Sequence, residues 1–210
     1  THSPPWCHAT IPSVLPNSQN LNVLLLTRSR PVACTVQSGG GLAEYAVAPA
    51  SLTVARPPEV SAVEGACLPA AGGSALQLLK LAGVSFDGTS GTTGPKNVLV
   101  TAASGGVGTF AVQLASLAGH HHVTATCGAR NLELVADMGA DEALDYKTPE
   151  GAALKNSSGK KYDYIVNTTN GGKWSAFKPS LSSHGRVVDV APNFGNFVAS
   201  ILTLFSKKKL

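Results

Sequence analysis

The spacing of apolar residues along this chain changes its period, most clearly between residues 97 and 115. Val98, Leu99 and Val100 form a short, continuous apolar run, which is typical of a buried strand. Beyond the glycine-rich stretch 104–108, apolar residues recur with helical spacing at positions 107, 110, 111, 114 and 115. The pattern therefore predicts a strand, a tight turn and a helix in that order.

The alternation of strand and helix continues to the end of the chain. It predicts strands at 122–127, 142–146, 162–167, 185–190 and 201–205, and helices at 131–138, 149–155 and 174–181. Strands separated by helices favour a parallel sheet with right-handed crossovers. We therefore expect an α/β fold with a doubly wound parallel (Rossmann) sheet of about six strands.

The chain before residue 96 follows other patterns. Residues 42–47 and 52–55 have the composition of two short strands. Two helices are predicted at 61–68 and 75–82. The first has the capping-box spelling of Ser61 followed by Glu64, and Pro69 is expected to end it.

The glycine-rich stretch Ser104-Gly105-Gly106-Val107-Gly108 has the composition of a phosphate-binding corner. Glycine keeps such a turn tight, lets the backbone approach a pyrophosphate and lets the helix pack closely on the strand. The first helical N–H groups are then free to bind an anion. The spelling is Ala-x-x-Gly-x-x-Gly from residue 102, not strict Gly-x-Gly-x-x-Gly, and a turn that binds nothing is the alternative.

The end of the second predicted strand indicates which dinucleotide would bind. An acidic residue there usually holds the ribose 2′-hydroxyl of NAD. This chain instead has Cys127-Gly128-Ala129-Arg130, and Asp137 and Asp141 come too late for the acidic role. Arg130 can pair with a 2′-phosphate, which favours NADPH. The alternative is that Arg130 is an ordinary surface cation of the next helix.

Composition and charge limit the classes of ligand and partner that this chain is expected to bind. The chain of 210 residues is 43% hydrophobic and 13% charged, with a net charge of +4, which is typical of a globular protein and gives no reason to expect nucleic acid binding. The basic run 207–209 is expected to be solvated, with contact to a membrane surface as the alternative. The four cysteines are widely spread, and the histidines at 2, 8 and 120–122 lack a matching ligand set, so no metal site is predicted.

Several stretches together resemble a known family. LPAAGGSALQLL (68–79) resembles the Leu-Pro-x-x-Gly-x-Thr-Ala-x-x-x-Leu signature of zinc-independent medium-chain dehydrogenases/reductases, with Ser74 in place of threonine. Residues 98–115, 123–131, 138–155 and 159–166 look very close to plant chloroplast-envelope quinone oxidoreductase homologues.

The resemblance implies an NADPH-dependent, zinc-independent enzyme that reduces quinones or α,β-unsaturated carbonyls by hydride transfer, in the chloroplast envelope or stroma. It implies that the pyrophosphate is held by Ser104, Gly105, Gly106, Val107 and Gly108, and the 2′-phosphate by Gly128 and Arg130. It also implies that Tyr146 lies against the adenosine and that Asn167, Ala191 and Pro192 line the nicotinamide side, with Ser74 also near the cofactor. No catalytic residue is identified.

The sequence also departs from this family. Family members are longer and begin with a β-rich, GroES-like substrate domain carrying an Asn-Pro-x-Asp-x-Lys motif that is absent here. We therefore expect a chain truncated at both ends, with residues 1–37 divergent or disordered, a partial substrate domain at 38–95 and a dinucleotide-binding domain at 96–210. A binding module or interaction protein without turnover is the alternative. A homodimer is expected by analogy and from the predicted edge strand at 201–205.

Overall fold

The chain divides into two units, residues 1–73 and 74–210. The structure, a computed structural model, describes residues 23–26, 32–34, 46–49, 53–86, 94–119, 121–191, 194–203 and 208–209. The domain boundaries expected after residues 37 and 95 stay predictions.

The first unit contains two small antiparallel ladders. β1 (Val23–Leu26) pairs with β3 (Ala46–Pro49), and β2 (Val32–Cys34) pairs with β4 (Thr53–Ala55). The strand predicted at 42–47 overlaps β3 at residues 46 and 47, and its residues 42–45 lie outside the described residues. β1 and β2 lie within residues 1–37, which were expected to be divergent or disordered, and the rest of that segment is outside the described residues.

The first helix begins at the predicted cap. α1 (Ala62–Cys67) follows Ser61, whose hydroxyl accepts the N–H of Glu64 at 3.3 Å, while the Glu64 carboxylate accepts the N–H of Ser61 at 2.8 Å. Interactions of the Glu64 carboxylate with Ser61, with its side chain first and its backbone second, lower the pKa of Glu64.

The α-helix ends just before Pro69 as expected, but the chain stays helical beyond it. A π-helical turn, η3 (Leu68–Gly72), follows α1 directly and leads into α2 (Gly73–Ala82). Pro69 stands at the start of η3, where the hydrogen-bond pattern changes, so its missing N–H removes no helical hydrogen bond.

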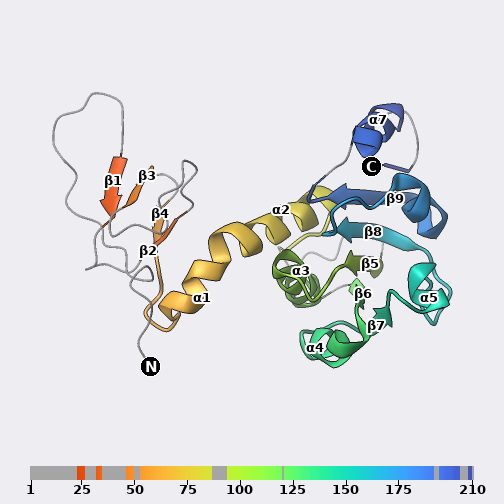
Figure 1. Cartoon of the computed structure of the whole chain (residues 1–210), viewed down its shortest axis with the longest axis horizontal. Helices are drawn as coiled ribbons and strands as arrows, with labels where there is room; N and C mark the ends of the chain where they lie inside the picture. Colours follow the sequence, from red (N-terminus) through yellow and green to blue (C-terminus); the bar gives the residue numbers. More distant parts are fainter. Residues whose placement is uncertain are drawn as a thin grey trace. The chain divides into compact units, whose positions relative to one another are not determined.

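The second unit is built on a parallel five-stranded sheet in the order β7-β6-β5-β8-β9, visible in Figure 1. Its strands are β5 (Lys96–Thr101), β6 (His121–Cys127), β7 (Glu142–Asp145), β8 (Tyr162–Asn167) and β9 (Leu181–Asp189). The chain adds strands outward from β5 on one side and then on the other, which creates a topological switch point between β5 and β8. The predicted α/β fold class is confirmed.

Helices cover both faces of this sheet, with α2 and α3 on one side and α5 on the other (Figure 1). The helices and helical turns after β5 are α3 (Gly106–Leu117), η4 (Ala129–Asn131), α4 (Leu132–Asp137), α5 (Pro149–Ala152), α6 (Trp174–Phe177), η5 (Lys178–Ser180) and α7 (Phe194–Leu202). The helix predicted at 174–181 is shorter than expected, because β9 already begins at Leu181. No helix in the described part of the chain has the length and apolar content needed to cross a membrane.

The two faces of the sheet explain the continuous apolar run in β5. Val98 and Val100 belong to the core formed with α2 and α3, whereas Leu99 belongs to a second core that includes Ile165 and Phe177. The three β5 residues are fully buried. A central strand that is covered on both faces has no solvent-facing side, so its sequence shows no alternation.

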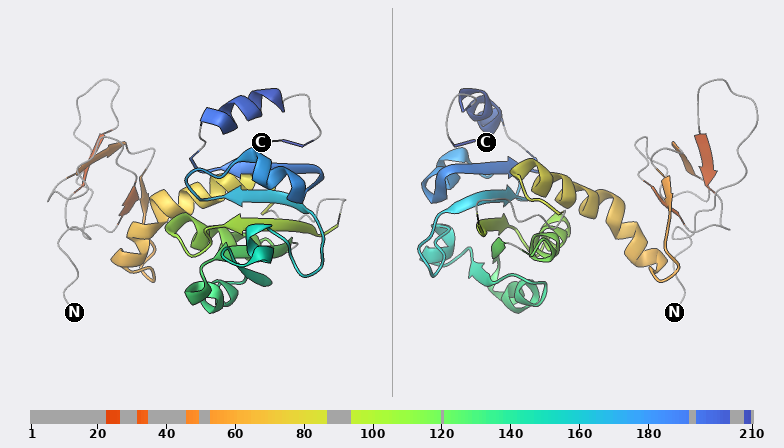
Figure 2. Two further views of the ribbon diagram at one scale, coloured as in Figure 1. Left: turned by 45° about the vertical axis from the view of Figure 1, so that its right-hand side comes forward. Right: turned by 180° about the vertical axis from the view of Figure 1, so that it is seen from behind.

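The strand predicted at 201–205 is wrong where the structure describes it. Ile201 and Leu202 close α7, and positions 204 and 205 lie outside the described residues. Apolar residues at 194, 197, 198, 201 and 202 follow helical spacing, which a five-residue window was too short to reveal. Figure 2 shows α7 beside β9, and Lys209 forms an isolated parallel bridge to Arg186 of that strand.

Burial of Tyr162 generates a prediction about pH. Its side chain is fully buried in β8, and burial raises the pKa of its hydroxyl. The folded state holds this proton more tightly than the unfolded state does. The contribution of Tyr162 to the free energy of unfolding is therefore fully present below the unfolded-state pKa of about 10, and it is lost as the pH rises through the folded-state pKa. Tyr162→Phe should make the alkaline loss of stability smaller, as measured by urea unfolding at neutral and alkaline pH.

Tyr146→Phe, at an exposed tyrosine, is the control and should keep the wild-type alkaline loss. Burial also raises the pKa of Tyr164, so part of the loss remains in Tyr162→Phe. An equal alkaline loss in Tyr162→Phe and wild type would contradict the prediction.

Candidate cofactor site

The turn between β5 and α3 leaves backbone N–H groups free. Ala102 adopts a positive φ of 48°, and the N–H of Gly105 donates to its carbonyl at 2.9 Å. Gly105 then acts as the extended N-cap of α3. The first hydrogen bond within the helix runs from the N–H of Thr109 to the carbonyl of Gly105, so the N–H groups of residues 106–108 lack an acceptor within the helix.

Gly108 is the position in this turn that has no room for a side chain. A Cβ there would lie 2.3 Å from the carbonyl oxygen of Ala102 and 2.7 Å from Cα of Ala103. Both are backbone atoms and cannot move aside as a flexible side chain would. The glycine therefore lets α3 begin directly against the end of β5, as expected for close packing of helix on strand.

The end of β6 lies beside this turn. Asn131 donates from Nδ2 to Oγ of Ser104 at 3.0 Å and so joins the segment after β6 to the glycine corner. Gly128 starts η4, and Arg130, two residues further on, is exposed. Asn131 was not predicted as a site residue, although it is the first residue of the helix predicted at 131–138, a position where asparagine is a typical cap.

Tyr146 completes this part of the site. It follows β7, donates its N–H to the carbonyl of Cys127, and has a side chain that is 54% exposed. A Cβ on Gly128 would lie 3.6 Å from the Tyr146 ring, so the ring lies against the backbone of residue 128. The ammonium of Lys147 is 5.8 Å from the centre of the same ring. Lys147 was not predicted, although it follows Tyr146 directly in the sequence.

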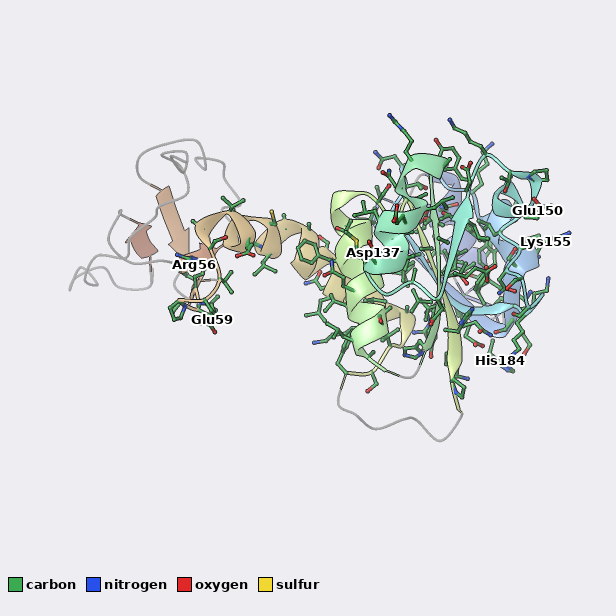
Figure 3. The ribbon with its side chains drawn as sticks, turned by 90° about the horizontal axis from the view of Figure 1, so that it is seen from below. Arg56, Glu59, Asp137, Glu150, Lys155 and His184 are labelled. Carbon is green, nitrogen blue, oxygen red and sulfur yellow. The ribbon has the colours of Figure 1, made fainter. Side chains whose placement is uncertain are left out.

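Acidic and thiol groups also lie next to this region. Asp145 accepts the N–H of Lys147 at 3.0 Å. Burial, assisted by the negative charge of Asp145, raises the pKa of the Cys127 thiol, which therefore stays protonated at neutral pH. Asp137 is exposed at the C-terminal end of α4 (Figure 3).

Polar side chains connect the strand ends on the other side of the switch point. Asn167, which is 1% exposed at the end of β8, accepts at Oδ1 from the hydroxyls of Thr101 at 2.6 Å and Thr169 at 2.8 Å. Its Nδ2 donates to the carboxylate of Asp189 at the end of β9. The network therefore bridges β5, β8 and β9 at one edge of the sheet.

Asn196 of α7 extends this network. It is 3% exposed and donates from Nδ2 to the Asp189 carboxylate and, at 2.6 Å, to the carbonyl of Gly172. Its Oδ1 accepts the N–H of Trp174 at 3.1 Å. Neither Asp189 nor Asn196 was predicted as a site residue, because their contacts join segments that are distant along the chain.

The structure brings most of the predicted residues to the carboxyl edge of the sheet. The residues that follow strand ends there are Ser104, Gly105, Gly106, Val107, Gly108, Gly128, Tyr146, Asn167 and Ala191. Ser74 lies in the first turn of α2, and no hydrogen bond within the described part of the chain joins it to the glycine corner. Pro192 lies outside the described residues. In the described ranges, no cluster of three or more His, Cys, Asp or Glu side chains forms a metal site.

Comparison with known proteins agrees with this architecture. A profile of the zinc-binding dehydrogenase family matches residues 106–209. The quinone-oxidoreductase homolog of Spinacia oleracea, which is chloroplastic, is 58% identical over 177 residues, covering 82% of this chain and 52% of that protein. The chloroplast envelope quinone oxidoreductase homolog of Arabidopsis thaliana is 62% identical over 155 residues, covering 73% of this chain and 46% of that protein.

More distant relatives share the fold. The trans-enoyl reductase RAP2 of Pyricularia oryzae is 38% identical over 130 residues, covering 60% of this chain and 36% of that protein. The quinone oxidoreductase of Thermus thermophilus, solved also in complex with NADPH, superimposes with a TM-score of 0.67 at 26% identity and covers 89% of this chain and 58% of that one.

A parallel doubly wound sheet with a glycine corner at its switch point defines a nucleotide-binding oxidoreductase fold. The similarity to these relatives shows that the chain belongs to the medium-chain dehydrogenase/reductase family, among the proteins similar to quinone oxidoreductases. The chain spans about half the length of the spinach relative, since the alignment covers 52% of it.

The close packing at Gly108 generates a testable prediction. Gly108→Ala should lower stability by about 1–3 kcal/mol, because the new methyl group forces backbone atoms apart. It should also weaken dinucleotide binding, because the first turn of α3 has to shift. Urea unfolding and ligand titration measure the two effects.

Gly73→Ala is the matched control, since Gly73 also starts a helix but a Cβ there would lie 3.9 Å from its nearest neighbour. This variant should be as stable as wild type or more stable by up to about 1 kcal/mol. Wild-type stability and binding in Gly108→Ala would show that α3 does not depend on the missing side chain.

Proposed function

We propose that this chain binds NADPH along the carboxyl edge of its sheet. The observation that carries the proposal is the glycine corner, where the N–H groups of residues 106–108 have no acceptor within α3 and where Gly105 and Gly106 are exposed. A helix start of this kind suits a pyrophosphate, because the unpaired N–H groups and the helix dipole both favour negative charge.

The preference for NADPH over NADH rests on the end of β6. Arg130 and Lys147 are both exposed there, and residues 127–131 at the end of β6 include no carboxylate. Two cations beside a strand end that has no carboxylate of its own would favour a 2′-phosphate. The Tyr146 ring, lying against residue 128, offers a flat surface for the adenine.

We further propose that the protein reduces quinones or α,β-unsaturated carbonyl compounds. Bound NADPH would supply a hydride to an electron-poor carbon of the substrate. The relatives named quinone oxidoreductase and trans-enoyl reductase support these two substrate classes. The hydrogen-bonded strand ends at Thr101, Asn167 and Asp189 would hold the nicotinamide side of the site rigid.

The location of the protein, its oligomeric state, its contact with a membrane and its zinc independence are further proposals. A chloroplast location is supported by the names of the spinach and Arabidopsis relatives. The homodimer, contact with a membrane and zinc independence stay predictions. The edge strand that motivated the homodimer is a helix where the structure describes it, so the expectation now rests on analogy alone.

Cofactor choice is tested by titrating the chain with NADPH and NADH while following ligand fluorescence. Arg130→Ala should weaken NADPH binding by roughly tenfold, because it removes a charge-assisted hydrogen bond that contributes about 1–2 kcal/mol. NADH binding should stay nearly unchanged. Lys160→Ala removes an exposed lysine that precedes β8, at the opposite edge of the sheet, and should bind NADPH as wild type does. Equal loss of both dinucleotides in Arg130→Ala would contradict a contact with the 2′-phosphate.

Turnover is tested separately by following NADPH oxidation with a short-chain quinone and with an enone. Oxidation that requires both substrate and folded chain is the expected result. NADPH binding without oxidation of either substrate class would instead indicate a dinucleotide-binding module. A folded chain that binds neither dinucleotide would show that the glycine corner is only architecture.

A further inference from the structure

The loop between β8 and α6 is held at both ends and open in the middle. At its start, Asn167 is fixed by the network with Thr101 and Asp189. At its end, Asn196 binds the carbonyl of Gly172 and the N–H of Trp174. Asn170 and Gly171 form an exposed turn between these two anchors.

The two turn residues lack the restraints that would keep an asparagine side chain from reacting with the backbone. Within the described part of the chain, no hydrogen bond is made by the Asn170 side chain or by the Gly171 N–H. Gly171 has a φ of +92°, and a Cβ built on it would meet nothing within 4 Å. The backbone nitrogen after Asn170 therefore has no competing acceptor, and no atoms crowd the position of a side chain on Gly171.

The other asparagines that the structure describes differ in both respects. Asn170 is the single asparagine of the sequence that is followed by glycine. Several others use their side-chain amides in hydrogen bonds, which hold the amides in place: Asn97, Asn131, Asn156, Asn167 and Asn196. A reaction between side chain and backbone is therefore expected to favour Asn170, because glycine follows it and no hydrogen bond restrains its side-chain amide.

We propose that Asn170 is a site of spontaneous deamidation at the carboxyl edge of the sheet. Hydroxide removes the proton from the Gly171 nitrogen, which attacks Cγ of Asn170. The bond from Cγ to the side-chain nitrogen breaks, and this nitrogen takes a proton from water and leaves as ammonia, which regenerates the hydroxide and leaves a five-membered succinimide. Water then opens this ring at either carbonyl and gives an aspartyl or an isoaspartyl residue, so no oxidant or reductant takes part.

The products change the loop in two ways. An isoaspartyl residue carries the main chain through its Cβ, which adds one atom between two anchored ends and displaces Gly172 from Asn196. Either product also places a new carboxylate three residues after Asn167, where it would repel an anionic dinucleotide. The modification is independent of the proposed function, whereas its effect on NADPH binding rests on it.

The test incubates the purified full chain at neutral and mildly alkaline pH and follows each asparagine by peptide mapping and mass spectrometry, with enzymatic methylation to detect isoaspartate. The Asn170 peptide should convert roughly tenfold faster than any other asparagine peptide, because glycine offers the least steric resistance to ring closure. Its rate should rise in proportion to hydroxide concentration. Asn170→Gln, which cannot form the five-membered ring, is the matched control and should stay unmodified.

The same incubation in urea gives the unfolded reference rate. Conversion of Asn170 in the urea-unfolded chain but not in the folded chain would overturn the proposal, since it would mean that the turn protects the residue. Asn170→Asp, as a stable copy of one product, should bind NADPH several-fold more weakly than Asn170→Gln. Equal NADPH affinities would refute the functional consequence, while the mapped modification would still stand.

Discussion

The close approach of α3 to the end of β5 is the constraint on which the second unit depends. Gly108 allows it, because any Cβ there would overlap the backbone of Ala102 and Ala103. The same approach keeps α3 against the core that contains Val98 and Val100. It also aims the first N–H groups of α3 out of the carboxyl edge of the sheet. One missing side chain therefore serves both the packing of the fold and the proposed binding of an anion.

A polar network gathers at the carboxyl edge of the sheet. The central strands are buried on both faces and are largely apolar, and the network lies where these strands end. Asn167 and Asp189 share it, and each satisfies groups of a neighbouring strand. The buried amide of Asn167 and the half-buried carboxylate of Asp189 are stable there because their partners are fixed.

Helix α7 is attached to this edge in an unusual way. Its buried residue is the polar Asn196, whereas Phe194, Phe197 and Leu202 are largely exposed. Hydrogen bonds to Asp189 and Gly172 therefore hold the helix where apolar packing would normally do so. This attachment makes the loop after β8 and the start of α7 one connected structure.

The sequence by itself determined the order of strands and helices from β5 to β9, the glycine corner and the cap at Ser61, because these depend on residues close together along the chain. It predicted the bounds of β8 and the apolar centre of β5. It did not predict the helix at 194–202, although the helical spacing is present there, nor the helical continuation past Pro69 or the role of Lys147. The contacts of Asn131 and Asn196 depend on which distant segments meet: Asn196 reaches Asp189 and Gly172 only after β8 and β9 have paired. Local spacing carries no record of such contacts, so only the tertiary structure decided them.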